Sequence, residues 1–419
     1  MSPASRAVYR RRRIVVLGAL VVIALLGSYL PVALLAPVPA ASATIPDAPE
    51  QSIEAVALAT PAAGSSAIGI GSTGSVLAGT TLGTSGSADP LPIASITKSI
   101  TALVVLDAMP IPDGGQGPDI TITDTDAQYL ADTIAVGGSW ASVFPGQVLS
   151  ERQVIEIMML ESANNYSLTL ANWAFGSVPA YLAAADAWIA DHGLSGTTVV
   201  DTSGLDPGSR STTADLLTIA GLVLADPTLA AIVGTASDQL PQLGEIENTN
   251  TLLGSSGIDG IKTGTTDEAG LCLLFSADFE VAGQSIPLVG VVLGAASEDE
   301  LHAAVLALLQ SAQAGFRTVD VVTAGQVLGS YSTPWGSSAD IVAGESLTTT
   351  VWSGATIAES SEVLSLTTAP AGTEVGTARF TVTGLALDGP ELTVPLTLAT
   401  ELEGPDAGWK LANPGRLFG

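Results

Sequence analysis

The pattern of apolar and polar positions changes several times along the chain, and its first stretch is almost wholly apolar. Residues Ile14–Ala36 form a 23-residue run without a charged side chain, directly after Arg10–Arg13. A run of this length can cross a bilayer as a helix, and the arginines are expected to stay on the cytoplasmic side. The small residues Ala41-Ser42-Ala43 also fit a signal-peptide cleavage site. We predict a membrane anchor or signal segment over residues 1–43, favour the anchor, and expect the body to be exported either way.

A Pro/Ala-rich linker at 44–64 leads into a body in which helical and strand periods both occur. Apolar runs alternating with Gly and Ser predict a β-hairpin at 67–78, and 110–148 is expected to be irregular with one small helix. Apolar stretches of helical length lie at 95–109, 154–160, 162–175, 178–192, 212–225 and 297–314. Strand-length stretches lie at 258–263, 271–278 and 286–293. Because the helices cluster between the strands, we predict an α/β sheet with a helical insertion.

From residue 317 the composition changes to mostly Thr, Val, Gly and Ser, and apolar and polar residues alternate in short stretches at 319–328, 347–351 and 378–385. No convincing helical pattern remains in this stretch. Short alternating runs between turn residues are typical of antiparallel β domains. We therefore predict a central domain at 65–316, followed by a separate β-sandwich-like domain at 317–419.

The net charge of −28 is unevenly distributed along the chain. Residues 1–43 hold five arginines and no acidic residue, so the rest has 8 basic against 41 acidic residues. A body this acidic repels phosphate groups, which excludes binding of nucleic acid through phosphate neutralisation.

The single cysteine, Cys272, excludes intrachain disulfides and any cysteine-based metal cluster. It lies in an apolar run and is expected to be a small buried residue. The two histidines, His192 and His302, are far apart in sequence, and nothing near either of them indicates a zinc site or a catalytic triad. We expect both to be structural or on the surface, and we predict no metal and no cofactor.

Lysine is the most informative residue because the whole chain has only three, Lys98, Lys262 and Lys410. Ser95 and Lys98 lie three residues apart at the start of an apolar helix, so one helical face carries a hydroxyl and an amine. A serine hydroxyl needs a base to become a nucleophile, and a desolvated lysine can be that base. Each motif alone is weak. Their occurrence in order, Ser95-x-x-Lys98, Ser162-x-Asn164 and Lys262-Thr263-Gly264, makes a purely structural explanation improbable.

These three motifs resemble those of the penicillin-interacting serine enzymes, and the chain resembles a low-molecular-mass penicillin-binding protein of the serine D-alanyl-D-alanine carboxypeptidase type. Further support comes from Asn248–Leu253, Gly257–Thr266 and Ser203–Asp206. The resemblance covers residues 65–315 well and the β-rich tail more weakly. It implies a β-lactamase/DD-peptidase-like fold, with an antiparallel sheet flanked by helices, an all-helical subdomain and a C-terminal β-rich domain.

The resemblance also implies a role for each residue of the motifs. Ser95 would attack the carbonyl of the terminal D-Ala-D-Ala bond, and Lys98, held neutral by burial and by the charge of Lys262, would accept its proton. Ser162 and Lys262 would relay that proton to the leaving D-alanine. The other assignments are Asn164 for the substrate amide, the backbone N–H groups of Ser95 and Thr265 for the oxyanion hole, and Thr263, Gly264 and Thr265 for the substrate-binding strand with its carboxylate-binding hydroxyls.

The chain departs from some relatives at Ala214, where they carry an arginine that grips the substrate carboxylate. Arg210 lies close in sequence and is our candidate for a replacement. The balance between carboxypeptidase and endopeptidase activity stays open at this point.

The implied partners are peptidoglycan stem peptides ending in D-Ala-D-Ala, and β-lactam antibiotics as acylating inhibitors. The implied location is the extracytoplasmic face of the membrane, or the cell wall if the N-terminal segment is cleaved. Two alternatives remain: a β-lactamase-like hydrolase, and a penicillin-sensing protein that is acylated without turnover. The absence of a Glu-x-x-Leu-Asn pattern between Ser162 and Lys262 argues against a class A β-lactamase.

Overall fold

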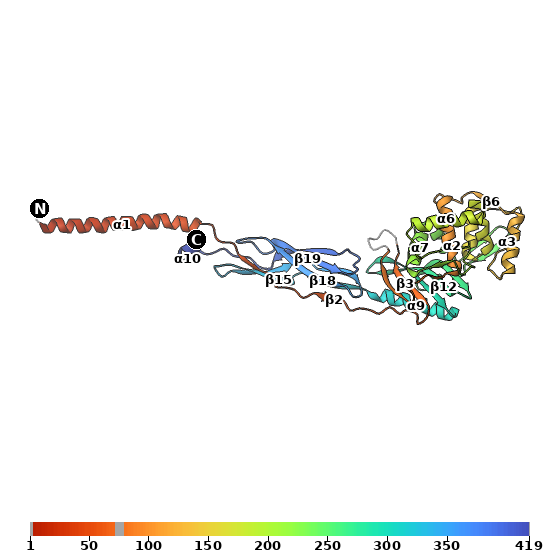
Figure 1. The fold of residues 1–419 in the computed structure, drawn as a ribbon. Coiled ribbons are helices and arrows are strands. Elements are labelled where there is room, and N and C mark those ends of the chain that lie inside the picture. The colour runs from red at the N-terminus through yellow and green to blue at the C-terminus, as the bar shows by residue number, and fades with distance from the viewer. Residues whose placement is uncertain (1–2, 72–78, 419) are drawn as a thin grey trace. The chain divides into compact units, whose positions relative to one another are not determined.

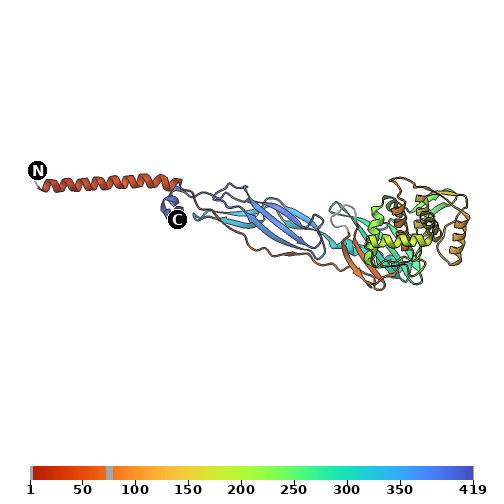
Figure 2. The same cartoon turned by 45° about the horizontal axis from the view of Figure 1, so that its top comes forward.

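The computed structural model describes residues 3–71 and 79–418, and divides the chain into two compact units. One unit comprises Glu54–Arg317 and the other comprises Met1–Ile53 together with Thr318–Gly419. Figures 1 and 2 show the ribbon of each unit in two views. The chain thus contributes to the second unit before and after it forms the first.

The Glu54–Arg317 unit is built on a five-stranded antiparallel sheet with the order β11-β12-β13-β3-β4. The strands are β3 (Ser65–Ile70), β4 (Thr81–Ser85), β11 (Ile258–Thr266), β12 (Gly270–Val281) and β13 (Gln284–Ala295). β11 is an edge strand, paired only with β12, with Thr263 opposite Leu273 and Thr265 opposite Leu271. This edge is therefore free to approach other parts of the chain.

Most described helices of this unit lie between residues 97 and 233, coloured orange to green in Figures 1 and 2. They are α2 (Thr97–Ala108), α3 (Asp124–Ala135), α4 (Glu151–Leu160), α5 (Asn164–Phe175), α6 (Val178–Asp191), α7 (Thr213–Ala225) and α8 (Pro227–Val233). Short strands precede, separate or follow these helices: β5 (Leu91–Pro92), β6 (Asp119–Thr121), β7 (Val148–Ser150), β8 (Arg210–Ser211), β9 (Ser237–Leu240) and β10 (Gly244–Glu247). A 3₁₀ turn, η1 (Ala94–Ile96), precedes α2.

α2 lies at the centre of the hydrophobic core, and its residues Thr97–Leu106 are all buried. α7 packs against β13 and β3, and its buried Leu216 and Ile219 share one core cluster with Cys272 and Leu274 of β12. α9 (Glu298–Gly315) packs on β12 and β13, too, and begins directly after β13 ends. The N-terminal part of α2, which directly follows Ser95, is thereby held inside the core.

The predicted fold class is confirmed, as are the expected helices. The three strands expected between residues 258 and 293 are present as β11, β12 and β13. The first strand of the predicted 67–78 hairpin is present as β3, whereas residues 72–78 lie outside the described residues. The pairing partner of β3 is β4, which begins at Thr81. α8 and the β9–β10 pair were not predicted, because each is too short to show a period.

The other unit holds a seven-stranded antiparallel sheet with the order β1-β15-β16-β20-β19-β18-β2. Its strands are β1 (Ser42–Thr44), β2 (Gln51–Ser52), β15 (Val327–Ser332), β16 (Ser338–Ala343), β18 (Thr356–Val363), β19 (Glu374–Thr383) and β20 (Glu391–Leu398). A second pair joins β14 (Phe316–Val322) to β17 (Leu347–Trp352). Alternate residues of β19 are buried, as expected for a sheet with one face on a core.

Two expectations for this unit need correction: the linker at 44–64 and the lack of helices after residue 317. The segment 44–64 was predicted to be a linker, but β2 within it pairs with β18 at one edge of the sheet, and β1, which ends at Thr44, pairs with β15 at the other edge. Strands of two or three residues carry no readable alternation, and the Pro-rich composition hid them. The C-terminal stretch also contains two short helices, α10 (Ala407–Ala412), capped by Asp406, and α11 (Pro414–Leu417).

The N-terminal helix α1 (Pro3–Leu35) contains Val8–Leu35, which by length and composition can cross a membrane.

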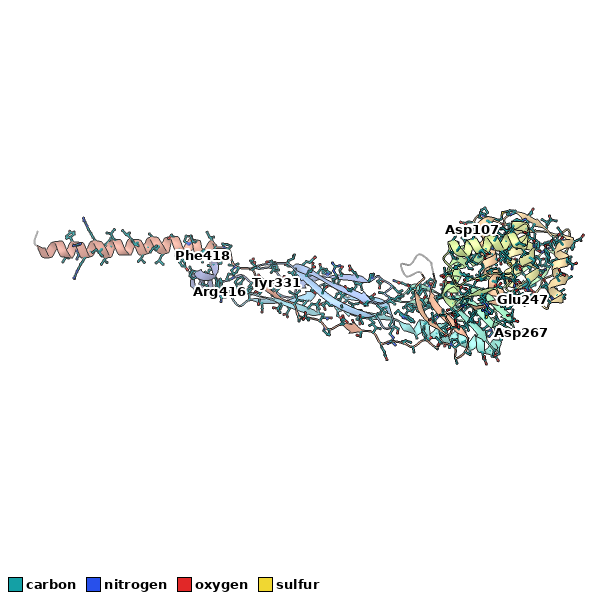
Figure 3. All side chains as sticks on the ribbon, in the orientation of Figure 1. Asp107, Glu247, Asp267, Tyr331, Arg416 and Phe418 are labelled. Carbon is teal, nitrogen blue, oxygen red and sulfur yellow. The ribbon has the colours of Figure 1, made fainter. Side chains whose placement is uncertain are left out.

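The acidic side chains of the Glu54–Arg317 unit lie largely at its surface. Asp107, Glu247 and Asp267, labelled in Figure 3, are all exposed.

Candidate active site

The serine of the first motif stands on a strained turn at the start of α2. Ser95 is half-buried in the middle of η1, and the residue before it, Ala94, has a φ of +45°. Left-handed φ is unfavourable for a residue with a Cβ and persists only when surrounding structure holds it. The turn places Ser95 directly before α2, whose residues Thr97–Leu106 are buried.

Lys98 is the second residue of α2, three residues after Ser95, and is fully buried, with 0% of its surface exposed. Its Nζ lies 2.8 Å from Ser95 Oγ and donates to Ser203 O at 3.2 Å. Burial, and secondly the charge of Lys262, lower the pKa of Lys98 well below its ordinary value, while Asp201 opposes the shift. A neutral amine donates to the carbonyl and keeps a lone pair for the serine proton, so this geometry suits a general base.

The carbonyl that orients Lys98 is held by a loop organised around one carboxylate. Asp201 Oδ1 accepts from Gly204 N–H at 2.7 Å and from Ser209 Oγ at 2.8 Å, and Oδ2 accepts from Asp206 N–H at 3.0 Å. Gly204 has a φ of +78°, and a Cβ there would lie 1.8 Å from the carbonyl oxygen of Ala94. Only glycine lets this loop approach the serine turn so closely.

The second lysine, Lys262, comes from the edge strand β11 and is 1% exposed. Burial lowers its pKa to about 7. Its Nζ donates to Thr263 Oγ1 at 3.5 Å. Gly264 lets β11 approach the serine turn, since a Cβ at this position would lie 2.9 Å from Ile93 O and 3.1 Å from Ser95 N.

The middle motif lies between α4 and α5. Ser162 has a φ of +56° and is 5% exposed. Asn164 N–H donates to Ser139 O at 2.8 Å, and its buried Oδ1 has no hydrogen-bond partner among the described residues. An unpaired buried amide oxygen is costly, and a ligand N–H group would satisfy it. Within the described chain, Ser162 Oγ makes no hydrogen bond to either Lys98 or Lys262.

These segments meet at a polar pocket of about 250 Å³. Five of the residues that the motifs predicted line it: Ser95, Ser162, Thr263, Gly264 and Thr265. Lys98 and Lys262 are buried beside these residues rather than in the lining, and Asn164 lines an adjacent pocket that also contains Asp201 and Ser203. The three motifs, remote in sequence, therefore converge.

Several lining residues were not predicted: Ser139, Thr249, Thr251, Glu298 and His302. The prediction that His302 is merely structural or on the surface missed its place in the pocket wall. The residues around His302 in the sequence do not indicate this position, because it depends on the packing of α9 against the sheet. Thr249 and Thr251 belong to the Asn248–Leu253 stretch noted above, so a sequence signal for them existed.

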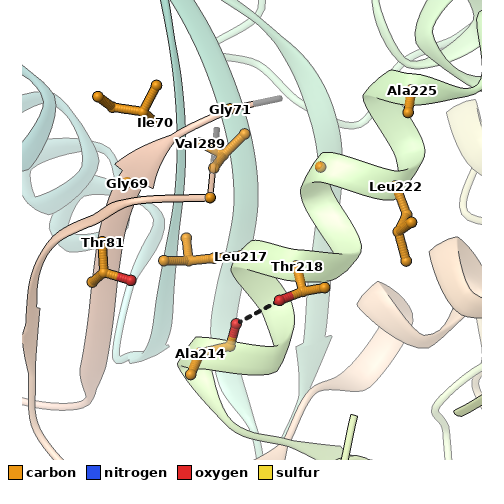
Figure 4. Close-up of a pocket in the computed structure, with 12 residues that line it drawn as sticks. Gly69, Ile70, Gly71, Thr81, Ala214, Leu217, Thr218, Leu222, Ala225 and Val289 are labelled. Carbon is orange, nitrogen blue, oxygen red and sulfur yellow. Dashed lines mark hydrogen bonds between the residues drawn. The ribbon is translucent and has the colours of Figure 1, made fainter. Parts of the chain in front are cut away.

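Arg210 does not line the pocket. Its side chain is exposed and its Nε donates to Pro207 O at 3.0 Å, so the expected replacement for the missing arginine is not in place. Ala214 lines a different, apolar pocket of about 430 Å³, where its carbonyl oxygen accepts from Thr218 Oγ1 (Figure 4). The described lining of that pocket contains no titratable side chain, so it offers no acid–base chemistry.

Within the described residues, no three His, Cys, Asp or Glu side chains are arranged to hold a metal ion. The thiol of Cys272 is buried, and burial raises its pKa to about 11, so it is not a nucleophile at neutral pH. Neither a metal cluster nor the thiol thus supplies the chemistry of the described pocket, which leaves its serine hydroxyls, with the lysine amines buried beside them, as the candidate nucleophile and base.

Comparison with known proteins adds independent evidence. The chain is 30% identical over 259 residues to D-alanyl-D-alanine carboxypeptidase DacD of Salmonella typhimurium, covering 60% of this chain and 64% of that protein. A mutant of the Streptomyces DD-transpeptidase superposes with a TM-score of 0.53 at 26% identity, covering 61% of this chain and 99% of that one. DacD from Francisella tularensis, at 21% identity, shares the fold with a TM-score of 0.54 over 85% of this chain and 97% of its own.

The curated relatives are matched over 51% to 64% of their own length. A family model described as D-alanyl-D-alanine carboxypeptidase matches residues 55–297, which is more than half of the chain. This span includes Ser95, Ser162 and Lys262, the residues that converge on the pocket. The chain belongs to the D-alanyl-D-alanine carboxypeptidase family.

Proposed function

We propose that this protein is a serine-type D-alanyl-D-alanine carboxypeptidase that works through an acyl-enzyme on Ser95. The observation that carries the proposal is the 2.8 Å separation between Ser95 Oγ and the amine of a fully buried lysine, Lys98. As Ser95 Oγ bonds to the penultimate D-alanine carbonyl carbon, its proton passes to Lys98 Nζ. The C–N bond then breaks, the leaving D-alanine amine takes a proton, and water hydrolyses the ester and restores Ser95.

The surrounding residues divide the remaining tasks. We assign Ser162 and Lys262 to the relay that returns the proton to the leaving amine, and the position of Ser162 in the same pocket as Ser95 supports its part in this assignment. The unpaired Oδ1 of Asn164 supports its role in receiving the substrate amide. The close approach at Gly264 supports an oxyanion hole formed by the N–H groups of Ser95 and Thr265. Lys262, Thr263 and Thr265 would hold the terminal carboxylate.

The proposed substrates are peptidoglycan stem peptides ending in D-Ala-D-Ala, and β-lactams are proposed as acylating inhibitors. α1 supports a single-pass anchor that holds the body at the extracytoplasmic face, since its uncharged apolar run begins at Ile14, directly after Arg10–Arg13. The acidic body makes nucleic acid an unsuitable partner.

Mass spectrometry of the purified full-length chain after incubation with benzylpenicillin tests the proposal. We expect the addition of one intact penicillin, located on the peptide that contains Ser95, and D-alanine release from a D-Ala-D-Ala-terminated peptide. A Ser95→Ala chain serves as control, and labelling that survives this change refutes the mechanism. Acylation without D-alanine release points instead to a sensing protein, and rapid penicillin turnover points to a β-lactamase.

The buried lysines predict a bell-shaped pH dependence of kcat/KM for D-alanine release. Lys98 must be neutral, so activity rises as pH passes upward through its lowered pKa. Lys262 must be charged to pair with the carboxylate, so activity falls as pH rises through its pKa of about 7. Lys262→Arg keeps the charge and should move the alkaline limb upward. An alkaline limb that does not move in the Lys262→Arg chain contradicts this assignment.

A further inference from the structure

A short segment of the pocket wall, residues 247–251, is tied to three separate elements, and we call it the 247–251 strap. At its first end, Glu247 N–H donates to Glu161 Oε1 at 2.7 Å and Thr249 N–H donates to Leu160 O at 3.1 Å. Leu160 and Glu161 directly precede Ser162. The strap is therefore hydrogen-bonded to the loop that carries the middle motif.

The centre of the strap is tied to the edge strand β11. Asn250 is 3% exposed, and its Nδ2 donates to Gly260 O at 3.1 Å. Next to it, Thr249 Oγ1 lies 2.7 Å from Thr263 Oγ1. Thr263 is one of the hydroxyls assigned to the substrate carboxylate, and both threonines line the pocket.

The last residue of the strap is fixed against α9. Thr251 Oγ1 lies 3.1 Å from Glu298 Oε1 and 3.0 Å from His302 Nε2. A carboxylate can only accept a hydrogen bond, so the threonine donates its single proton to Glu298. It must then accept from the imidazole, which places a proton on His302 Nε2. Both ends of the strap are thus anchored independently of the Thr249 side chain.

We propose that Thr249 is a positioning residue for the carboxylate end of the substrate, acting through Thr263. A hydroxyl has one proton, so only one of these two threonines can donate to the other. If Thr249 donates to Thr263, the Thr263 proton is free for the carboxylate. This chain of donors strengthens each hydrogen bond and ends on a charged acceptor.

The assignment matters more in this chain because the described lining of the pocket contains no arginine that could bind the carboxylate. Ala214 occupies the position that carries it in some relatives, and Arg210 bonds to Pro207 O outside the pocket. The anion must therefore be held by Lys262 and by hydroxyls whose protons point toward it. Lys262 Nζ also donates to Thr263 Oγ1, at 3.5 Å, but Thr249 Oγ1 lies closer, at 2.7 Å, and is the hydroxyl partner that can impose this orientation.

The inference rests on the proposed function and is tested on the full-length chain with Thr249→Val. We expect kcat/KM to fall about tenfold for a peptide ending in D-Ala-D-Ala, as for loss of a hydrogen bond that supports a charged acceptor. For the same peptide with a methyl ester in place of the terminal carboxylate, we expect a change within about twofold. Thr249→Ser keeps the hydroxyl and should restore the peptide activity. Thr251→Val removes a hydroxyl from the same strap and should not discriminate between the two substrates.

An equal loss on both substrates, or a failure of Thr249→Ser to restore activity, would overturn the inference, because either result indicates a merely structural role. The rate of acylation by benzylpenicillin and by its methyl ester gives the same comparison without turnover. A wild-type chain that is acylated but releases no D-alanine would therefore count against the carboxypeptidase assignment alone. Equal effects of Thr249→Val on the two penicillins would count against the role of Thr249.

Discussion

Replacing Lys98 with methionine will lower the acylation rate of Ser95 by about 10²–10⁴-fold, the usual contribution of a general base. Methionine fills a similar volume but has no amine, so the serine proton loses the acceptor that lies 2.8 Å away. The rate of labelling by fluorescent penicillin measures this loss. Lys410→Met, at a partly exposed lysine of α10 in the other unit, is the matched control and should label at the wild-type rate.

The same substitution will not destabilise the protein at neutral pH. The pKa of Lys98 is lower in the folded chain than in the unfolded chain, so folding must release its proton, and this cost is present at every pH below the unfolded value of about 10.5. Removing the amine removes that cost, and the gain disappears as pH rises past 10.5. Thermal unfolding at pH 7.5 should thus give an equal or higher Tm for Lys98→Met. A lower Tm together with lost labelling would mean that the variant reports damage to the fold rather than loss of the base.

Replacing Gly204 with alanine will cost about 3–5 kcal/mol of unfolding free energy, in the range seen for severe steric conflict in a core. The new Cβ would lie 1.8 Å from Ala94 O and 2.4 Å from Thr97 Oγ1, at a φ of +78°. The backbone cannot yield easily, because Ala94 belongs to the buried turn below Ser95. We also expect loss of penicillin labelling, since the loop that carries Ser203 O would move away from Lys98.

Gly193→Ala is the matched control for this prediction. Gly193 has a φ of +68°, but no heavy atom lies within 4 Å of the position that an added Cβ would take, so its substitution carries only the backbone term of about 1 kcal/mol. Urea unfolding followed by intrinsic fluorescence compares the two variants. Equal destabilisation of both variants would show that the close approach of Gly204 to Ala94 O adds nothing to the loss of unfolding free energy.

The central fold and the reacting groups could be predicted because they depend on side chains with few alternative uses. Because the chain has only three lysines and two of them lie within motifs, the pairing of Lys98 with Ser95 could be predicted from the sequence. The long strands β12 and β13 carry enough residues for their apolar pattern to be recognised. The fold class followed from the order of these elements.

The rest of the site could not be predicted, because it depends on backbone atoms and on contacts between distant elements. The oxygen that orients Lys98 is the main-chain carbonyl of Ser203, which any residue could supply. His302 reaches the pocket wall only because α9 packs beside β12, and its neighbours in sequence give no sign of this. Arg210 failed as a candidate because proximity in sequence does not determine where a side chain points.

The two short strands β1 and β2 impose an order on the assembly of the chain. β1 pairs Ser42–Thr44 with Ser330–Ser332, so its partner is synthesised only after the whole Glu54–Arg317 unit. Contacts this remote in sequence form slowly, because a long loop must close before they stabilise anything. The Glu54–Arg317 unit can therefore fold while the edge strands β1 and β2, which precede it in the chain, still lack the partners β15 and β18 that follow it.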